Sequence, residues 1–444
     1  MKKNSLGFRL LRLVTFWVTG NLTAIFAIWH AAVGWKILVG ILCGILFLFF
    51  QFAHVHTIAG EKKLASLAHG CDLLRTSIVW FCLELLTAGV LFWGVKLFWV
   101  ILLIDLGVFS LLCWFTVFQG LLHIALHSTQ VKLPWHVALF FLWWVPLLNL
   151  FLVGHVYHTA KRELQLECSK AECNIMRKES EICKTKYPIL LVHGIFFRDW
   201  QFFNYWGRIP AELIRNGATI FYGKQQSAQS ISVSAKELAA QIQSVIAETG
   251  AEKVNVIAHS KGGLDSRYLI SGLHMAPYVA SLTTICTPHR GSMLADLLMK
   301  LPDFLYRGIC GLMDRYFGML GDRAPNAYVA SRQLSCAWAQ EFNRKYPDSS
   351  SVYYQSYASM MKCGASCWLL SIPYWILKLL DAGSDGLVTE ESARWTNFRG
   401  TLKNTYLHGI SHGDMIDLAR EDYKGFDVME FYIHLAEGLK ERGL

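Results

Sequence analysis

The stretch that decides the fold is KVNVIAHSKGG, residues Lys253 to Gly263. An apolar run rich in β-branched residues leads into Ser260, and two glycines follow shortly after it, so the segment predicts a strand that turns sharply into a helix. Such a turn projects the serine hydroxyl above the sheet, where a base and a carbonyl carbon can both reach it. Small residues two positions before and after the serine make the turn possible, and Ala258 and Gly262 fill these places. Ser260 is therefore the candidate nucleophile.

Strand-like and helix-like runs alternate on both sides of this turn, as a mostly parallel sheet flanked by helices requires. We expect strands at Pro188–Val192, Ala218–Tyr222, Val254–Ala258, Val279–Ile285 and Val352–Tyr357, and helices at Ser234–Thr249 and Gly262–Ser271. Residues 187–444 are enough for one α/β domain with a sizeable core. The fold class predicted for this region is α/β.

A serine that attacks an acyl carbon needs two hydrogen-bond donors for the oxyanion that develops. One is the backbone N–H of Lys261, directly after the serine, and the other comes from the loop after the first strand. That loop reads HGIF from His193, and its glycine lets the backbone approach a substrate closely. The sequence therefore supplies both halves of an oxyanion hole.

Five short blocks in a fixed order give the region a family resemblance. They are YPILLVHGIF from Tyr187, KVNVIAHSKGGLDSRYL from Lys253, TTICTPHRGS from Thr283, SDGLV from Ser384 and SHGD from Ser411. Together they resemble the bacterial triacylglycerol lipases of the pseudomonad type, within the α/β-hydrolase superfamily. The resemblance implies an α/β-hydrolase fold with Ser260 as nucleophile, Asp385 as acid, His412 as base and the backbone N–H groups of Ile195 and Lys261 as the oxyanion hole.

The chain order supports these roles, because hydrolases of this superfamily place the serine first, then the acid, then the histidine. His412 would take the serine proton and deliver it to the leaving alcohol, while Asp385 would hold the imidazole tautomer. Asp381 and His408 are the nearest alternatives, although they fit the motifs less well. We expect the other histidines of the motifs to shape loops, namely His193, His259 and His289.

The first 157 residues form a different region, which predicts an all-α transmembrane bundle. Crossing the hydrocarbon core takes about 20 predominantly apolar residues. The candidate spans are Val14–Val33, Ile37–Val55, Ser77–Val95, Leu97–Phe118 and Trp135–Val156. Only Gly94, Val95 and Lys96 separate the third from the fourth, so one of the two is alternatively a longer, interrupted or re-entrant segment. We expect four or five spans.

Charge and flanking sequence predict a multi-pass protein of a bacterial cytoplasmic membrane. Most of the net charge of +9 lies in this apolar half, which favours lipid headgroups over nucleic acid as its partner. No small-residue cleavage site follows the first apolar run, so we interpret that run as a retained anchor. The excess of basic residues places the amino terminus in the cytoplasm, and the hydrolase region then lies inside after four spans or outside after five.

Two acidic residues and several cysteines leave alternatives open. Glu84 and Asp105 lie within apolar runs, where an ionisable group is costly; each is either a functional group or a carboxyl that faces a neighbouring helix. The pairs Cys168–Cys173 and Cys363–Cys367 have zinc-like spacing without a neighbouring histidine pair, so we expect neither a metal nor a cofactor there.

Three further segments surround the predicted hydrolase. Residues 158–186 are charged and predict a linker. Residues 292–330 carry apolar residues at near-helical spacing, and the resemblance implies a mobile lid there; the alternative is a pair of ordinary core helices. Cys367–Leu380 is apolar but too short to span a membrane, so it either dips into the interface or covers the core.

This chain also departs from the family that it resembles. Many of its members bind a calcium ion beside the histidine, and Asp414 matches one ligand, but no aspartate stands at the partner place in Ser359–Cys367. The sequence predicts a membrane-anchored serine hydrolase whose substrates are lipid esters. The alternatives are a lipid acyltransferase and a non-catalytic protein that binds lipid or a partner through a hydrolase-like domain.

Overall fold

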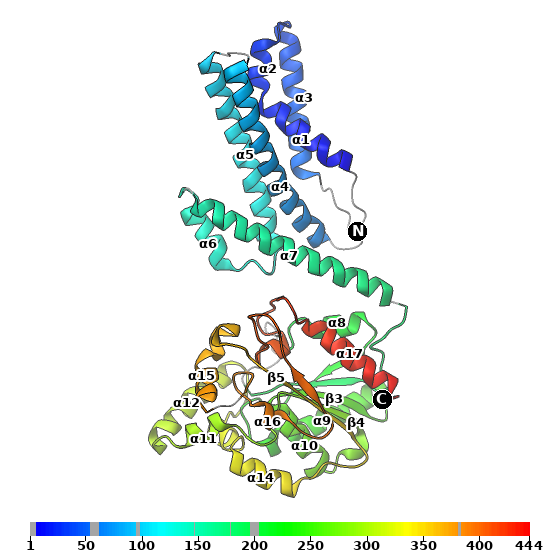
Figure 1. The fold of residues 1–444 in the computed structure, drawn as a ribbon. Helices are drawn as coiled ribbons and strands as arrows, with labels where there is room; N and C mark the ends of the chain where they lie inside the picture. Colours follow the sequence, from blue (N-terminus) through cyan, green and yellow to red (C-terminus); the bar gives the residue numbers. More distant parts are fainter. Residues whose placement is uncertain are drawn as a thin grey trace. The chain divides into compact units, whose positions relative to one another are not determined.

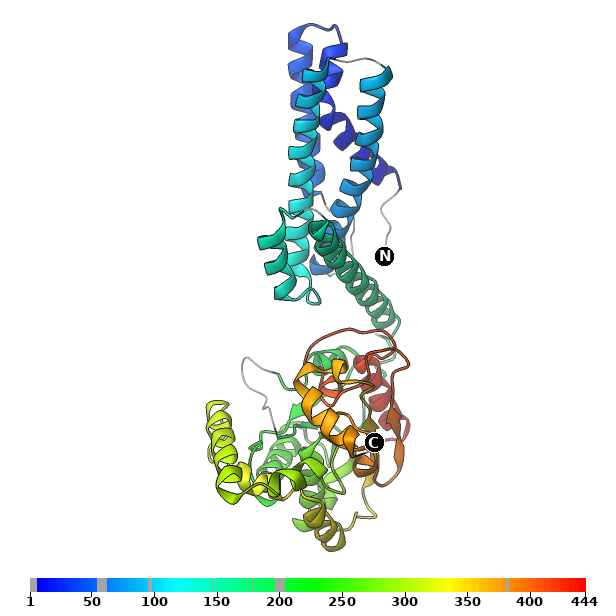
Figure 2. The ribbon, with the colours of Figure 1, turned by 60° about the vertical axis from the view of Figure 1, so that its left-hand side comes forward.

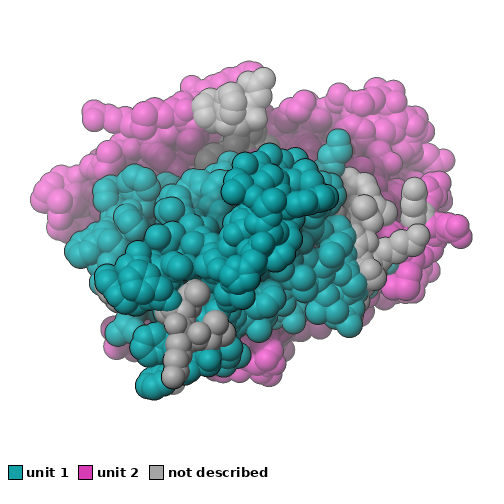
Figure 3. Space-filling view, turned by 90° about the horizontal axis from the view of Figure 1, so that it is seen from above, with its two compact units in different colours: residues 1–173 teal, residues 174–444 magenta. Residues whose placement is uncertain are grey.

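The computed structural model describes residues 6–53, 62–94, 98–145, 147–177, 179–195, 204–380 and 383–444. The chain forms two compact units, Met1–Cys173 (unit 1) and Asn174–Leu444 (unit 2), which Figure 3 shows in different colours. Unit 1 is helical, whereas unit 2 holds a six-stranded parallel sheet flanked by helices (Figure 1 and Figure 2).

Helices with apolar outer surfaces build unit 1. In chain order they are α1 (Leu6–Gly20), α2 (Leu22–Ile28), α3 (Val33–Phe52), α4 (Lys62–Gly89), the π-helix η1 (Val90–Gly94), α5 (Trp99–His127), α6 (Leu133–Leu142) and α7 (Leu148–Arg177), the last of which ends in unit 2. Helices α4 and α5 pack along each other (Figure 1 and Figure 2). Aromatic residues fill part of the interior, where Phe16, Phe47 and Trp80 are in contact.

Among the described residues, three helices are long and apolar enough to cross a membrane: α3, α4 with η1, and α5. The pair α1–α2 is a fourth if it is counted as one span, although it bends by 64°. The expected span Trp135–Val156 is wrong, because the structure divides it between α6 and α7. Helix α6 has 10 residues, which gives about 15 Å of helix, half of the hydrocarbon core. Helix α7 continues instead into charged sequence.

The two acidic residues of the apolar runs meet the break between α1 and α2. Asn21 at the break donates from Nδ2 to Oε2 of Glu84 at 2.8 Å, and the backbone N–H of Ala24 donates to Oδ1 of Asp105 at 2.9 Å. Both carboxyl groups are buried. Since the first N–H groups of a helix have no partner within it, an anion there is stabilising. The structure thus gives both residues a role in holding the broken helix.

Unit 2 is centred on a parallel sheet with the strand order β2-β1-β3-β4-β5-β6. The strands are β1 (Ile189–Val192), β2 (Ile220–Tyr222), β3 (Val254–His259), β4 (Val279–Ile285), β5 (Tyr353–Ser359) and β6 (Phe398–Leu402). Every expected strand is present, with small shifts at its ends. Strand β6 escaped sequence analysis because its residues are mostly half-buried and include an arginine and a glycine.

Helices cover both faces of this sheet. Their bounds are α8 (Ile209–Arg215), α9 (Ile231–Thr249), α10 (Lys261–Gly272), α11 (Met293–Met299), α12 (Asp303–Met319), α13 (Ala327–Arg332), α14 (Cys336–Lys345), α15 (Ser371–Leu379), α16 (Glu390–Ala393) and α17 (Val428–Glu441). Short 3₁₀ turns lie at η2 (Ala276–Tyr278), η3 (Gly364–Ser366), η4 (Trp368–Leu370) and η5 (Asp414–Ile416).

Alternate residues of the central strands serve two cores. Ile189 and Leu191 of β1 pack with α8 and α17, whereas Leu190 and Val192 pack with α9 and α10. Strands that are buried on both faces must be apolar throughout, which explains the continuous run at Pro188–Val192. The serine turn joins the central strand β3 to α10, so unit 2 has the α/β-hydrolase fold.

The segment predicted as a linker, residues 158–186, begins inside α7. That helix ends at Arg177, whose guanidinium forms two 2.8 Å hydrogen bonds with the carboxylate of Glu430 on α17. Cys183 is fully buried in the core beside α17. The last part of this segment is thereby attached to unit 2.

Candidate active site

Ser260 lies on a strained turn at the end of β3. Its φ of 54° and ψ of −132° are an unfavourable conformation for a residue with a side chain, and such strain is typical of functional turns. Space on the far side of the turn is minimal: a Cβ on Gly262 would lie 2.5 Å from the carbonyl oxygen of His193. Thr287 donates its hydroxyl hydrogen to the carbonyl oxygen of Ser260 at 2.8 Å. These contacts hold the serine in place.

Asp385 and His412, predicted as acid and base, are brought together by the structure. Oδ2 of Asp385 lies 2.7 Å from Nδ1 of His412, and the backbone N–H of His412 donates to the carbonyl oxygen of Asp385 at 2.9 Å. The other carboxylate oxygen, Oδ1, accepts the N–H groups of Leu387 and Val388 at 2.9 and 2.8 Å. Both carboxylate oxygens of Asp385 thus have hydrogen-bond partners, which fixes the orientation of the carboxylate.

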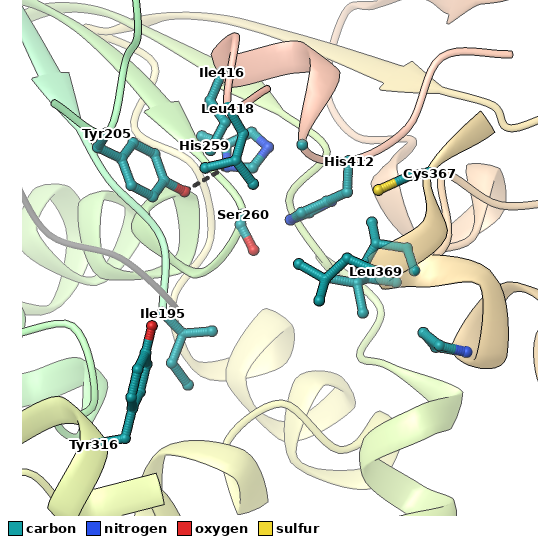
Figure 4. Close-up of a pocket in the computed structure, with 14 residues that line it drawn as sticks. Ile195, Tyr205, His259, Ser260, Tyr316, Cys367, Leu369, His412, Ile416 and Leu418 are labelled. Atoms are coloured by element: carbon teal, nitrogen blue, oxygen red, sulfur yellow. Dashed lines mark hydrogen bonds between the residues drawn. The ribbon is translucent and has the colours of Figure 1, made fainter. Parts of the chain in front are cut away.

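Ser260 and His412 line the same cavity, and in Figure 4 the His412 ring points toward Ser260. The cavity has a volume of about 380 Å³ and mostly apolar walls. Its lining residues are Ile195, Tyr205, His259, Ser260, Tyr316, Cys367, Leu369, Leu370, Pro373, Leu387, His412, Gly413, Ile416 and Leu418. A serine, an imidazole and a carboxylate therefore follow one another from the cavity into the protein.

Of the two predicted oxyanion residues, Ile195 borders the same space. Ile195 is buried and lines the cavity, and a Cβ on Gly194 would lie 2.8 Å from the Cβ of Ser260, so this loop approaches the serine closely. Phe196, the next residue of the motif, lies outside the described residues. On the other side, Lys261 opens α10 with its backbone N–H free of any α-helical partner.

The Lys261 side chain is buried below the serine turn. Its ammonium donates to both carboxylate oxygens of Asp265 at 2.8 and 2.9 Å and to the hydroxyl of Ser234 at 3.1 Å. Burial raises the pKa of Asp265 to about 6, and the nearby ammonium opposes this rise. The hydrogen bond to Ser234 connects the first turn of α10 to α9.

Tyr205 is a site residue that sequence analysis missed. Its hydroxyl accepts the N–H of Gly194 at 2.9 Å and lies 2.7 Å from Nδ1 of His259. It thereby ties the oxyanion loop to the strand that carries the serine. Tyr205 stands outside every motif, and only the fold brings it to the serine.

Asp381 and His408 were the alternatives for the acid and the base. Asp381 lies outside the described residues. His408 stacks on Tyr423, with 4.0 Å between ring centroids, and its Nδ1 lies 2.8 Å from the carbonyl oxygen of Gly409. His408 is not among the residues that line the cavity.

The remaining motif histidines are fully buried. His193 contacts the carbonyl oxygens of Gly194 and Gln225 at 2.9 and 3.0 Å. Burial lowers the pKa of His259 well below its usual range, and the neighbouring His412 adds to this shift. Burial likewise lowers the pKa of His289, helped by Arg267 and Arg290.

The residues around the histidine turn do not fit a calcium ion. Oδ2 of Asp414 accepts the N–H of Ser411 at 2.8 Å. Asp417, the nearest further carboxylate, receives a bidentate pair from Arg208, with Nε to Oδ2 and Nη2 to Oδ1 both at 2.8 Å. Arg208 also reaches Asp422. The Arg208 guanidinium therefore holds this turn by its contacts with two carboxylates.

Part of the chain is similar to known lipases. The family described as Lipase (class 2) matches residues 186–293. The triacylglycerol lipase of Pseudarthrobacter phenanthrenivorans is 37% identical over 180 residues, which cover 37% of this chain and 55% of that protein. Triacylglycerol lipase 2 of Saccharomyces cerevisiae is 28% identical over 317 residues, covering 66% and 88%. The solved structure of the mature Bacillus licheniformis lipase BlEst2 aligns over 57% of this chain and 92% of that chain, with 21% identity and a TM-score of 0.43.

The matched part of the chain is the part that carries the serine. Residues 186–293 contain the oxyanion loop, the serine turn and the TPHRG block, whereas Asp385 and His412 lie beyond them. The chain spans about half the length of the first bacterial relatives that it matches. These similarities support a lipase family for the α/β region.

Proposed function

We propose that the chain is a membrane-anchored serine hydrolase that cleaves carboxylic esters of lipids through an acyl-enzyme. One observation carries this proposal: Ser260 and His412 line one apolar cavity, and Asp385 lies 2.7 Å behind His412. The sequence similarity to triacylglycerol lipases supports the same chemistry. A protein that only binds lipid has no need of all three groups in this order.

The geometry supports a two-step reaction. Nε2 of His412 takes the proton of the Ser260 hydroxyl while Oγ attacks the acyl carbon. The N–H groups of Ile195 and Lys261 stabilise the oxyanion, and the imidazolium then gives its proton to the leaving alcohol. Water repeats the sequence on the acyl-enzyme, which releases the acid and restores the serine. Asp385 holds the imidazole tautomer throughout.

The cavity supports a long acyl group as the part of the substrate that is bound. A dry apolar cavity of about 150 Å³ holds a benzene molecule. A volume of about 380 Å³ then accommodates roughly fifteen carbon atoms by the same scale. The walls are aliphatic and aromatic, which suits a chain rather than a polar headgroup.

Two apolar helices beside the cavity support a lid. Tyr316 of α12 and Pro373 of α15 line the cavity, while other residues of these helices are exposed. Phe304, Leu312 and Met319 of α12 are 73%, 69% and 74% exposed, and Ile372 and Leu379 of α15 are 75% and 85% exposed. So much exposed apolar surface requires something to cover it, and a lipid interface does so. We infer that α12, within residues 292–330, moves when the cavity opens.

The helices of unit 1 support an anchor in the lipid. Four crossings, with α1–α2 as one broken span, return the chain to the side of its amino terminus, which the positive-inside rule places in the cytoplasm. Reaction of Cys168 with an impermeant thiol reagent in sealed inside-out vesicles tests this orientation. Protection of Cys168 there, with reaction in right-side-out vesicles, assigns the opposite side.

Active-site labelling tests the proposed function. Full-length protein in detergent should react with a fluorophosphonate probe at Ser260 and hydrolyse acyl esters, and Ser260→Ala should lose both. Ser266→Ala, a buried serine six residues further on, is the matched control and should keep them. A folded wild-type protein without labelling or esterase activity would instead favour the non-catalytic binding protein.

A further inference from the structure

A buried group of metal-ligating side chains lies directly behind the serine. His259, Cys286 and His412 each offer one ligand atom, and these atoms all lie within 4.8 Å of one another. They come from three elements: the end of β3, the residue after β4 and the turn before η5. His259 and Cys286 are 0% exposed and His412 is 6% exposed.

One atom of this group is unsatisfied. Nδ1 of His259 lies 2.7 Å from the hydroxyl of Tyr205, but its Nε2 is buried without a hydrogen-bond partner among the described residues. Leaving a buried polar atom unpaired costs about 1–3 kcal/mol. The His259 ring centroid lies 4.3 Å from that of His412. An ion in this position would give Nε2 the partner that it lacks.

The chemistry of the three side chains selects the ion. Two imidazoles and a thiolate are typical ligands of Zn²⁺. Tetrahedral zinc keeps its ligand atoms about 3.3–3.8 Å apart, so the group must contract by about 1 Å. Both histidines line the cavity, which gives an ion a route of entry. Asp385, at 2.7 Å from Nδ1 of His412, or water can complete four-coordination.

We propose that His259, Cys286 and His412 form a Zn²⁺ site and that the bound ion reversibly inhibits the enzyme. The inhibition rests on the proposed function, because His412 is both a ligand and the base. If the ion binds Nε2 of His412, it occupies the lone pair that accepts the serine proton. If the ion takes Nδ1, the ring proton moves to Nε2 and the bond to Asp385 is lost. Cys286 binds as thiolate and releases its proton to solvent.

Zinc titration of the full-length protein in detergent tests the inhibition. Metal-free enzyme should lose ester hydrolysis as Zn²⁺ is added and recover it on addition of EDTA. Cys286→Ser, which keeps the shape of the side chain but removes the thiolate, should require at least about tenfold more Zn²⁺ to lose half of its own uninhibited activity. Cys183→Ser, another fully buried cysteine of unit 2, should behave as wild type. Equal inhibition of Cys286→Ser and wild type would overturn the proposal.

A spectroscopic test does not depend on catalysis. Co²⁺ in place of Zn²⁺ should give a thiolate-to-cobalt charge-transfer band in wild type, Cys183→Ser and Ser260→Ala, and Cys286→Ala should lack it. The band persists even if the protein shows no esterase activity, so failure of the proposed function and failure of the metal site remain distinguishable. Absence of the band from folded wild-type protein refutes the site.

Discussion

The two units of the chain place their charged and apolar side chains in opposite ways. In unit 1 the outward-facing residues are apolar, as Leu86, Leu111 and Phe140 are 69%, 71% and 74% exposed. Its interior instead holds ionisable groups, among them Arg12 and Asp105. Unit 2 has apolar cores on both faces of its sheet, and its ionisable groups gather inside mainly around the serine turn.

This contrast teaches which environment shapes each unit. Apolar side chains face outward at no cost only where the surroundings are apolar, and buried charges then hold helices together because water does not compete for them. In water the same arrangement would aggregate. The buried charges of unit 1 therefore serve structure, whereas unit 2 holds, beside Ser260, the pair Asp385–His412 on which the proposed function depends.

The largest expected effect separates these two uses of a buried carboxylate. Asp385→Asn should lower kcat by about 10⁴-fold, because the amide favours the wrong tautomer of His412. Asp105→Asn in unit 1 should leave kcat within about twofold, since it lies outside unit 2. Steady-state hydrolysis of a soluble ester measures both, and a large loss of kcat in Asp105→Asn would break the comparison.

The next effect concerns stability. Asp72→Ala in unit 1 should destabilise that unit by about 1–3 kcal/mol, because it removes the carboxylate that lies 3.4 Å from the guanidinium of Arg9, beside the buried Arg12. Asp303→Ala in unit 2 removes an ion pair to Arg307 whose side chains are 60% and 65% exposed, and it should cost less than about 1 kcal/mol. Unfolding in mixed micelles, followed by tryptophan fluorescence, compares the variants. Similar costs at both sites would argue that unit 1 is solvated like unit 2.

The third effect is a pH dependence of the stability of unit 2. Burial holds the pKa values of His259 and His289 well below the usual value of 6.5, so the unfolded chain takes up protons there before the folded protein does. Their stabilising contribution is present above pH 6.5 and is lost as the pH falls below it. Between pH 6.5 and 5.5 the loss should be about 1 kcal/mol for each histidine.

Denaturant unfolding at several pH values measures this slope. His289→Gln should make the decline shallower. An unchanged slope in His289→Gln would show that this histidine takes up a proton as readily in the folded protein as in the unfolded chain.

The smallest expected effect concerns the apolar surface beside the cavity. Ile372→Ser on α15 should lower hydrolysis of esters in lipid vesicles by a few fold, because less apolar area reaches the interface. Hydrolysis of a short soluble ester should not change. Ile214→Ser on α8, 53% exposed and absent from the cavity lining, is the matched control. Equal losses on both substrates would assign α15 to the stability of the pocket instead.

The sequence predicted the strands and helices that depend on residues close together in the chain. The strand and helix around Ser260 follow from β-branched residues and glycines within eleven positions, and β1 follows from its apolar run. Short motifs predicted Asp385 and His412 as acid and base, and the structure brings their side chains to 2.7 Å from each other. Tyr205 carried no such signal, and Cys286, although it lies in a quoted block, was not linked to His259, because these residues come together only through the fold.

Unit 1 shows features that could not be predicted from the sequence. Apolar composition predicted helices, yet it did not show that α1–α2 bends by 64° or that the last apolar run is divided. Glu84 and Asp105 form hydrogen bonds at this bend with residues that lie 63 and 81 positions away in the sequence. Long-range pairing of this kind is invisible to hydropathy.

The pairing of Arg208 with Asp417 has a consequence for how the active site opens. Arg208 follows the segment that carries Tyr205, and Asp417 follows the turn that carries His412, so the salt bridge joins the donor side of the site to its base. Local opening then exposes both sides together rather than one at a time. Amide hydrogens of the two segments should therefore exchange as a single cooperative unit.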